Sequence, residues 1–314
     1  MKEGYITRYI KKNGKKRKIL TYADEVLREE HKEIKKFLEG NLTFSKFTKA
    51  YIPNSSIYKN AKAHMYNDIF IKYDIKDFFN NIDHKLLVKQ LHEQLNLKYD
   101  KEKYSLLEVS QLINKCSYGK KGLPLGLISS PILANIYLKD FDNIVYGKLK
   151  NLGLTNIIYT RYADDLVISF KNIENVAIKF YEEKLKEIEA IVIKFLKKFK
   201  LKLNTNKKSI IDLNKSNHVR ITGISITKDK GNYRSLSVGK KKVISLYDEA
   251  LKLYLNRANE LNDEQLYKIA RIKGMESFIF SIHKKGYDHM FSQAMVNKLN
   301  DLGFKSLHEL IQTL

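Results

Sequence analysis

The chain of 314 residues has a single cysteine (Cys116), three prolines and no tryptophan. One cysteine excludes an intramolecular disulfide bond and any zinc site built from several cysteines. The chain also lacks a long apolar run that could cross a membrane, and its start, Met1–Gly4, lacks the apolar core of a signal peptide. These absences predict a soluble, cytoplasmic protein with no membrane partner.

Acidic residues are scarce relative to basic ones. The sequence holds 58 Lys and Arg but 35 Asp and Glu, a formal net charge of +23, and its pI is near 9.6. Such an excess of positive charge favours a polyanionic partner, and nucleic acid well ahead of a membrane surface. Because the basic residues are spread along the chain, we expect this partner to run across the whole molecule.

Two adjacent carboxylates interrupt this positive background, in the run Tyr162–Asp165 (Tyr-Ala-Asp-Asp). The flanking residues, 157–161 and 166–170, are rich in β-branched and aromatic side chains, which predicts two strands. Neighbouring side chains of a strand point to opposite faces, so both aspartates can serve one site only at the tip of a β-hairpin. Two carboxylates on one turn repel each other unless a cation such as Mg²⁺ neutralises them. For an isolated pair, a solvated polar turn is the alternative.

A third aspartate lies far upstream, at the end of an alternating stretch. In residues 68–75, apolar side chains recur at every second position. This period predicts a strand with Asp74 near its end, on the face opposite the apolar one. Two phenylalanines follow at 78–79, and Asp83 suits the N-cap of a helix over 84–95. A carboxylate at a strand end, followed by aromatics and a helix, suits an active site.

A basic turn lies near the start of the chain, at Lys11–Lys18. It separates two predicted strands, 5–10 and 19–22, so a short hairpin is expected. The turn includes Arg17. It can hold the phosphates of a template or an incoming nucleotide, or it can be a solvated basic loop.

A glycine-rich loop and a second hairpin are expected further along. Gly122–Pro131 begins with two glycines and a proline within five residues. This composition indicates a tight loop, where a backbone or a ligand can approach closely, as at Gly126. The loop begins a helix predicted over 132–149. Residues 219–227 and 233–238 are expected to form the two strands of a hairpin.

The composition changes near residue 239, where a helical and basic tail begins. We therefore expect two domains, 1–238 and 239–314. Positive charge recurs in the tail among aromatic residues, and it is expected to contact the phosphates of structured RNA. The expected RNA contacts of the tail include Lys240, Lys241, Lys242, Arg271 and Lys273.

A strand with an aspartate, a helix, a glycine-rich loop, a helix and an Asp-Asp hairpin follow one another in the order of the polymerase palm. Residues 74–79 (Asp-Ile-Lys-Asp-Phe-Phe) resemble the first palm motif of reverse transcriptases. Residues 162–165 resemble their aspartate-pair motif, and 122–131 are similar to the loop between the two. The resemblance implies an α+β fold in the form of the polymerase right hand. Fingers and a palm with an antiparallel sheet and helices would occupy 1–238, and a helical thumb 239–314.

Two more elements resemble those of bacterial retron reverse transcriptases. Residues 60–64 (Asn-Ala-Lys-Ala-His) match their Asn-Ala-x-x-His element, and 221–223 (Ile-Thr-Gly) match their Val-Thr-Gly element with one conservative change. The resemblance implies an RNA-directed DNA polymerase that uses dNTPs to reverse-transcribe a structured noncoding RNA. Priming from a 2′-hydroxyl of that RNA would leave a branched RNA–DNA product (msDNA). A role in anti-phage defence with a separate effector protein is also implied.

Alternatives to the retron assignment remain. A phage-defence reverse transcriptase of a non-retron group would share the same palm motifs. A non-catalytic RNA-binding scaffold could keep the polymerase fold. The intact set of three aspartates argues against a scaffold.

The resemblance also assigns roles to single residues. Asp74 and Asp164 would bridge two Mg²⁺ ions, with Asp165 as a weaker third carboxylate and the carbonyl of Ile75 as an extra ligand. Phe79 falls where the family has an aromatic steric gate, which excludes the 2′-hydroxyl of a ribonucleotide. The alternative is that Phe79, like Phe78, belongs to the core. These assignments predict a two-metal polymerase site selective for deoxynucleotides.

Further roles concern the nucleotide and the RNA. Lys207 or Lys208 matches the family lysine that neutralises the leaving pyrophosphate, and the spacing does not decide between them. Arg17 and Gly126 are expected at the nucleotide. Asn60 and His64 would contact RNA. For His64, a structural role is the alternative. The chain also departs from the family, because Leu125 stands where a glutamine is usual; no metal ligand is lost by this change.

Overall fold

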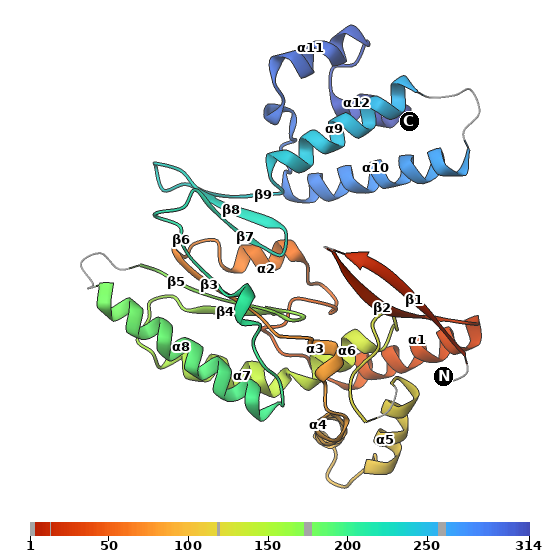
Figure 1. Ribbon diagram of the computed structural model, residues 1–314, viewed down its shortest axis with the longest axis vertical. Helices are drawn as coiled ribbons and strands as arrows, with labels where there is room; N and C mark the ends of the chain where they lie inside the picture. The colour runs from red at the N-terminus through yellow and green to blue at the C-terminus, as the bar shows by residue number, and fades with distance from the viewer. Residues whose placement is uncertain (1–3, 13, 118–119, 173–177, 257–261) are drawn as a thin grey trace. The chain divides into compact units, whose positions relative to one another are not determined.

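The computed structural model describes residues 4–12, 14–117, 120–172, 178–256 and 262–314. Figure 1 shows helices and small sheets along the chain, which divides into two compact units, 1–215 and 216–314. Every pairing between the described strands is antiparallel. The architecture is therefore α+β, as predicted. Within the described residues, no helix combines the length and the apolar character needed to span a membrane.

A four-stranded antiparallel sheet forms the centre of the first unit. Its strands, in spatial order, are β4 (Ile158–Tyr162), β5 (Asp165–Phe170), β3 (Ile69–Asp74) and β6 (Ser209–Asp212). The sequence predicts a single apolar face for β3. Phe70 and Ile71 are neighbours on this strand and both are fully buried, so the sheet is covered on both faces.

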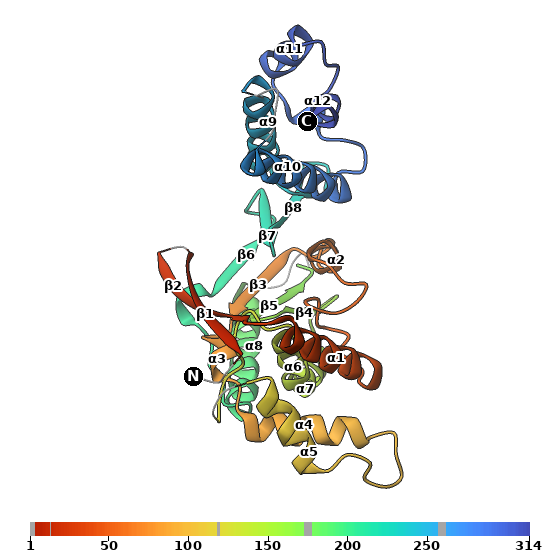
Figure 2. The same ribbon diagram turned by 90° about the vertical axis from the view of Figure 1, so that its right-hand side faces the viewer.

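Helices provide this cover. Figures 1 and 2 show α2 on one face of the sheet, with α7 and α8 along the other. The helices are α2 (Ile57–Ala63), α6 (Ser130–Tyr137), α7 (Lys139–Lys150) and α8 (Ile178–Lys198). The prediction of one continuous helix over 132–149 is wrong, because Leu138 (φ −103°, ψ 8°) departs from helical geometry between α6 and α7. Leu138 is fully buried, so the bend turns its side chain into the core.

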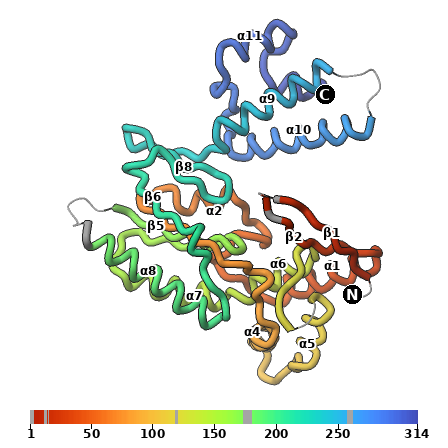
Figure 3. Tube along the Cα trace, in the orientation of Figure 1, coloured from red at the N-terminus to blue at the C-terminus, as the bar shows by residue number. Residues whose placement is uncertain are grey.

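The basic segment near the start of the chain forms the predicted hairpin. Its strands are β1 (Tyr5–Lys12) and β2 (Lys15–Tyr22), paired along their whole length. Residue 13, between these strands in the sequence, lies outside the described residues. Figure 3 traces the hairpin beside the glycine-rich loop, and the N–H of Leu20 donates a 2.8 Å hydrogen bond to the carbonyl of Leu125. This contact joins β2 to the loop that begins α6.

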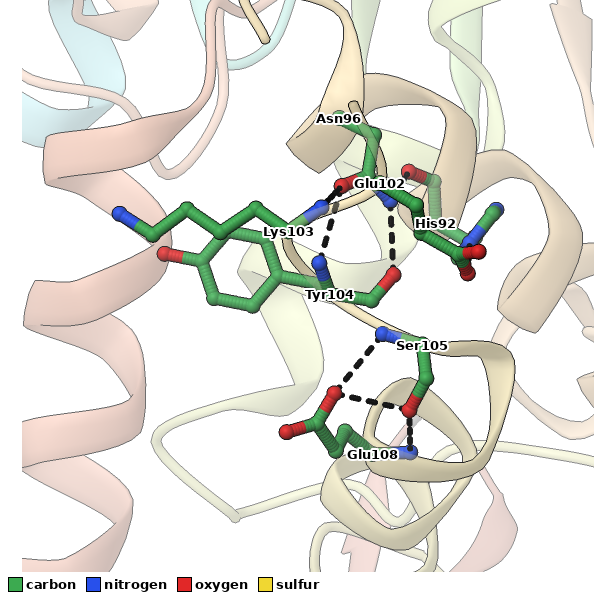
Figure 4. Close-up of polar contacts among 7 residues, drawn as sticks. All are labelled: His92, Asn96, Glu102, Lys103, Tyr104, Ser105 and Glu108. Carbon is green, nitrogen blue, oxygen red and sulfur yellow. Dashed lines mark hydrogen bonds and ion pairs between the residues drawn. The ribbon is translucent and has the colours of Figure 1, made fainter. Parts of the chain in front are cut away.

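The remaining helices of the first unit are α1 (Glu25–Asn41), α3 (Phe78–Asn81), α4 (His84–Asn96) and α5 (Leu106–Lys115). Asp83 is the N-cap of α4, as predicted. Figure 4 shows the connection between α4 and α5, where Nδ2 of Asn96 donates to the carbonyl of Tyr104 at 2.8 Å. Ser105 and Glu108 form a capping box that begins α5.

Within its described residues, the second unit combines a three-stranded sheet with four α-helices. They are β7 (His218–Ile221), β8 (Ile224–Lys228), β9 (Arg234–Ser237), α9 (Lys240–Leu255), α10 (Asp263–Ile282), α11 (Gln293–Asp301) and α12 (Leu307–Thr313). The prediction of a single strand over 219–227 is wrong. Thr222 (φ 46°) and Gly223 (φ 89°) turn the chain between β7 and β8.

The division between the units also differs from the expected domain boundary at 238/239. The N–H of Val238 donates to Nε2 of His283 at 3.3 Å, which joins the end of the small sheet to α10. The sheet and the helices therefore form one compact unit that starts at Ser216. The assignment of fingers, palm and thumb to particular residues stays a prediction.

Candidate active site

The three predicted carboxylates meet at one end of the central sheet. In the register of β3 and β5, Asp74 lies directly opposite Asp165, and residues so paired have Cβ atoms about 5 Å apart. The N–H of Ile75 donates a 2.9 Å hydrogen bond to the carbonyl of Asp164, which holds the hairpin tip against the end of β3. Antiparallel pairing thus brings together residues that are distant in the sequence.

The turn that carries two of these carboxylates is tight. Tyr162 pairs with Asp165, so Ala163 and Asp164 alone form the tip, which confirms the predicted hairpin. Ala163 has a φ of 56°, a left-handed conformation that costs a residue with a side chain about 1–2 kcal/mol. Nη1 of Arg161 donates to the carbonyl of Ala163 at 3.4 Å and helps to hold this conformation. Strained backbone held by its surroundings is typical of functional sites.

Crowding raises the pKa of both turn aspartates. Loss of hydration, together with the charges of Asp164 and Asp74, raises the pKa of Asp165 to about 6, although its side chain still reaches solvent. Loss of hydration and the charge of Asp74 also raise the pKa of Asp164, against the opposing effects of Lys207 and Arg17. The ionised carboxylates are therefore short of positive charge, which is the electrostatic condition for binding a cation.

Of the two candidate lysines, Lys207 is the one at the carboxylates. It ends the short 3₁₀ helix η1 (Thr205–Lys207), and its Nζ lies 2.5 Å from Oδ1 of Asp74. The hydrogen bond to Asp74 raises the pKa of Lys207, so its ammonium group stays charged. Lys208 points instead to α8, where its Nζ lies 2.7 Å from Oε2 of Glu189. The geometry thus distinguishes two lysines that the spacing did not.

Asn204 is a site residue that sequence reasoning missed. Its Nδ2 donates to Oδ2 of Asp74 at 3.1 Å, and its backbone N–H donates to the carbonyl of Asp74 at 2.7 Å. The preceding residue, Leu203, forms an antiparallel bridge with Ile75. An asparagine after a short apolar segment produces no periodic signal and belongs to none of the recognised motifs. Only the pairing of distant segments reveals its position.

The carboxylate oxygens at this end of the sheet are suitable ligands for a hard divalent cation. In the described residues, however, the three side chains do not lie close enough together to hold one. Carboxylate oxygens are the ligands that such ions prefer, and the raised pKa of Asp164 and Asp165 indicates that their charges lack a full counter-charge. Lys207 and Asn204 occupy the two carboxylate oxygens of Asp74. Within the described ranges, no three His, Cys, Asp or Glu side chains form a cluster close enough to hold an ion. A metal ion bound by all three carboxylates would compete with Lys207.

Phe79 and Arg17 lie on elements next to the carboxylates. Phe79 is half-buried on α3, directly after β3, and its ring packs edge-to-face against Phe78 with the centroids 5.4 Å apart. Phe78 itself is buried in the core. Arg17 is exposed on β2, and its charge lowers the pKa of Asp164. Arg17 is therefore available to a ligand at the carboxylates, whereas Phe79 also packs against the hydrophobic core. The roles of both residues stay predictions.

The close approach expected at Gly126 is to β2. Gly126 has a φ of 102°, and a Cβ there would lie 2.3 Å from the carbonyl oxygen of Leu20. Such a distance is far below van der Waals contact, so any side chain would force the loop and the strand apart. The described contacts thus explain this glycine by the seating of β2, without a nucleotide.

The sequence predicts RNA contacts at Asn60 and His64, but both side chains are fully buried, so this prediction is wrong. Nδ1 of His64 lies 2.7 Å from Oγ of Ser169, and its Nε2 lies 2.7 Å from Oγ1 of Thr160. Burial, aided by the charge of Lys49, lowers the pKa of His64 to about 3, so the ring is neutral. His64 ties the end of α2 to β4 and β5, which is the structural alternative.

The predicted RNA-binding charges of the second unit lie on two neighbouring helices. On α9 and α10 they are Lys240, Lys241, Lys242, Arg271 and Lys273. Lys240 and Lys241 are exposed at the start of α9, whereas Nζ of Lys242 lies over the ring of Phe278, 5.2 Å from its centroid. Arg271 forms an ion pair with Glu249. The contact of these residues with RNA stays a prediction.

A buried ion pair lies behind the aspartate turn, and no sequence pattern marks it. Arg161 and Asp142 are inaccessible to solvent, with Nε and Nη2 of Arg161 at 2.8 and 2.9 Å from the two carboxylate oxygens of Asp142. The hydroxyl of Tyr159 donates to Oδ1 of Asp142 at 2.7 Å, and Nη1 of Arg161 donates to Oδ1 of Asn135 at 3.1 Å. A buried pair of this kind persists when its remaining polar atoms are also hydrogen-bonded.

The chain is similar in sequence to proteins of known kind. Residues 10–226 match the family described as reverse transcriptase (RNA-dependent DNA polymerase). The chain is 32% identical over 161 residues to the Retron Ec73 reverse transcriptase of Escherichia coli, a match that covers 48% of this chain and 49% of that protein. It is 26% identical over 260 residues to the Retron Ec83 reverse transcriptase of the same organism, covering 82% of this chain and 75% of that protein. The chain thus spans about half the length of the first relative and three quarters of the second, and the resemblance to retron enzymes is confirmed.

A solved structure shows the same fold. Apo telomerase from Candida tropicalis matches 99% of this chain and 63% of its own, with a TM-score of 0.52 and 13% sequence identity. At this identity the likeness concerns the fold alone, and it confirms the predicted right-hand polymerase architecture. The family match covers most of the chain and includes all three carboxylates at the end of the central sheet. On these grounds, the chain belongs to the reverse transcriptase (RNA-dependent DNA polymerase) family.

Proposed function

We propose that this protein is an RNA-directed DNA polymerase that copies a structured noncoding RNA, with dNTPs as substrates. The observation that carries the proposal is the meeting of Asp74, Asp164 and Asp165 at one end of the sheet, with the ammonium group of Lys207 against them. The net charge of +23 supports a nucleic acid partner. Similarity to retron reverse transcriptases supports RNA as the template.

The proposed reaction joins a primer hydroxyl to the α-phosphate of a dNTP and releases pyrophosphate. Asp74, Asp164 and Asp165 would hold two Mg²⁺ ions, with the carbonyl of Ile75 as an extra ligand. Bound ions of this kind stabilise the charge that develops on the attacking and leaving oxygens. Lys207 keeps its proton beside Asp74 and would neutralise the leaving pyrophosphate.

Neighbouring residues would select and hold the nucleotide. Phe79 would exclude a ribose 2′-hydroxyl, which is supported by its half-buried ring directly after β3. Arg17 would bind nucleotide phosphates, since its charge already acts on Asp164. Gly126 would contribute indirectly, by seating the strand that carries Arg17.

Similarity to retron enzymes supports a more specific proposal. Priming from an RNA 2′-hydroxyl would give branched RNA–DNA (msDNA), and the complex would act in anti-phage defence with a separate effector protein. The basic residues of α9 and α10 would bind the RNA backbone, which is read by shape and charge. A cytoplasmic location, predicted from the sequence, completes this proposal.

Primer extension on an RNA template tests the polymerase activity. Asp74→Asn should lower the rate roughly 100-fold or more, as expected for the loss of an electrostatic group from an active site. Asp77→Asn is the matched control: Asp77 is exposed, lies three residues away and has a φ of 47°, which asparagine tolerates equally well. Normal polymerisation by the Asp74→Asn protein would overturn the assignment. A folded wild-type protein that extends no primer would favour the scaffold alternative.

The nucleic acid bound in cells tests the retron proposal. The protein is purified from its native locus, and half of the bound nucleic acid is treated with RNase before sequencing. A short discrete DNA joined covalently to RNA, absent from an Asp164→Asn preparation, is the expected result. DNA without an RNA branch would contradict the retron proposal and favour another group of phage-defence reverse transcriptases.

A further inference from the structure

A short segment before α2, residues 47–51, is fixed against the edge of the hairpin that carries Asp164 and Asp165. The N–H of Arg161 donates to the carbonyl of Phe47 at 2.9 Å, and the N–H of Lys49 donates to the carbonyl of Arg161 at 2.7 Å. Thr48 thereby forms a parallel bridge with Arg161. Backbone hydrogen bonds on both sides of one residue leave this segment little freedom to slide along β4.

Buried side chains fix the same segment from behind. Asn135 donates its Nδ2 to the carbonyl of Ala50 at 2.8 Å and accepts at Oδ1 from the hydroxyl of Thr48 at 3.0 Å. Asn135 in turn accepts from Arg161, whose charge is paired with Asp142. Thr48 and Ala50 are buried. One polar network therefore holds both the aspartate turn and this segment.

Tyr51 directly follows Ala50 in the chain, but it is exposed where Ala50 is buried. Its backbone has a φ of 58°, in the left-handed region that is uncommon for a large side chain. The side chain is 48% exposed, although Ala50 beside it is buried. Its ring lies next to that of Tyr162, with the centroids 6.3 Å apart and the planes at 44°. The fixed backbone thus presents an aromatic ring to solvent beside the catalytic turn.

The ring is also close to the catalytic carboxylates. Partial burial and the charges of Tyr162 and Asp164 raise the pKa of the Tyr51 hydroxyl, so the group stays neutral. A large exposed aromatic contributes little to the core. Beside the carboxylates of a polymerase it offers a flat face on which the last nucleobase of a primer can stack. We propose that Tyr51, packed beside Tyr162, provides a stacking face for the base at the end of the primer strand.

This inference rests on the proposed polymerase function and adds a substrate-binding residue to it. The network around Arg161 sets the position of both rings, because it holds Thr48 and Ala50 on one side and Ala163 on the other. Stacking on Tyr51 would orient the terminal sugar, and so its hydroxyl, toward the carboxylates. No proton or electron is transferred by Tyr51 in this role.

Fluorescence of 2-aminopurine at the primer end tests stacking without chemistry. The probe is bound as a primer–template duplex by the full-length protein in the absence of dNTPs, and its quenching is compared among variants. Tyr51→Ala should lose quenching at the primer end, whereas Tyr51→Trp and Tyr51→Phe should retain it. A second duplex carries the probe at the templating position. Unchanged quenching at the primer end in Tyr51→Ala, whatever the template probe does, would overturn the proposal.

Primer-extension kinetics provide the second readout. Tyr51→Ala should raise KM for the primer–template by roughly 5- to 150-fold, the effect of losing one stacked base, and leave KM for dNTP unchanged. The control is Tyr66→Ala: Tyr66 is 66% exposed and precedes β3 at the end opposite Asp74. Equal effects of both alanine variants would refute a specific role. Inactivity of the wild-type protein would count against the polymerase function, whereas the fluorescence result reports stacking by itself.

Discussion

Asp165→Asn should stabilise the metal-free protein at neutral pH. Asp165 lies opposite Asp74 and beside Asp164, and its pKa is raised to about 6. A shift of about two units corresponds to roughly 3 kcal/mol for a fully shielded group. Because the Asp165 side chain reaches solvent, screening reduces this figure to about 1 kcal/mol. Removing the charge should therefore raise the stability of the first unit by about that amount.

The sign of the pH dependence follows from the raised pKa. Below about pH 4 the carboxyl group is protonated in both folded and unfolded chains, so the substitution gains nothing. Between about pH 4 and 6 the unfolded chain loses the proton first, and the wild-type protein becomes progressively less stable than the variant. Above about pH 6 the difference is complete. For a unit of this size, 1 kcal/mol corresponds to a rise in Tm of about 2–4 °C.

Thermal unfolding followed by circular dichroism in EDTA, from about pH 4 to 8, measures this difference. Asp77→Asn, at an exposed position outside the carboxylate pair, is the control for the substitution itself. Excess Mg²⁺ should reverse the order, because the wild-type protein would gain binding energy that the variant has lost. A variant that is less stable in EDTA at neutral pH, or a gain that is the same at every pH, would refute the reasoning about crowded carboxylates.

Three further predictions concern neighbouring residues. Lys207→Met should lower kcat about 100-fold, whereas Lys208→Met, which loses only the pair with Glu189, should stay near the wild-type rate; equal kinetics for the two variants would contradict the selection of Lys207. Phe79→Ala should increase ribonucleotide incorporation in primer extension, and unchanged discrimination would exclude Phe79 as the gate. Asp142→Asn should lower the free energy of unfolding in urea by about 3–5 kcal/mol, because a buried guanidinium loses its counter-charge; a loss under 1 kcal/mol would contradict the burial of that pair.

Local signals in the sequence predict the two segments that carry the carboxylates. Alternation placed Asp74 at a strand end, and two adjacent aspartates between strands required a turn. Only the resemblance to the palm motifs places these segments at one site, and the structure adds the β3–β5 register, in which Asp74 lies opposite Asp165. The hairpin near the start of the chain and the N-cap at Asp83 were predicted from equally local signals.

The rest depends on contacts between distant segments. The break at Leu138 has no glycine or proline to mark it, and it arises where a leucine enters the core. For His64 the resemblance implies RNA contact, with a structural role as the alternative. Nothing local marks its partners, Thr160 and Ser169, which lie about a hundred positions away. Asn204 is likewise a site residue only because its side chain contacts Asp74, on a strand much earlier in the chain. Periodicity cannot reveal such pairs.

The close seating of Gly126 on β2 affects how mutational scans of this enzyme should be understood. Even alanine at this position would push against the carbonyl of Leu20, and the displaced strand also carries Arg17, three residues before Leu20. A substitution at Gly126 can therefore weaken the effect of the Arg17 charge on Asp164 without contacting a carboxylate or a nucleotide. Loss of activity in such a variant would report the seating of the hairpin. Restoring activity by a compensating change on β2 would be the sign of that indirect effect, and variation at these positions is expected to be correlated among related chains.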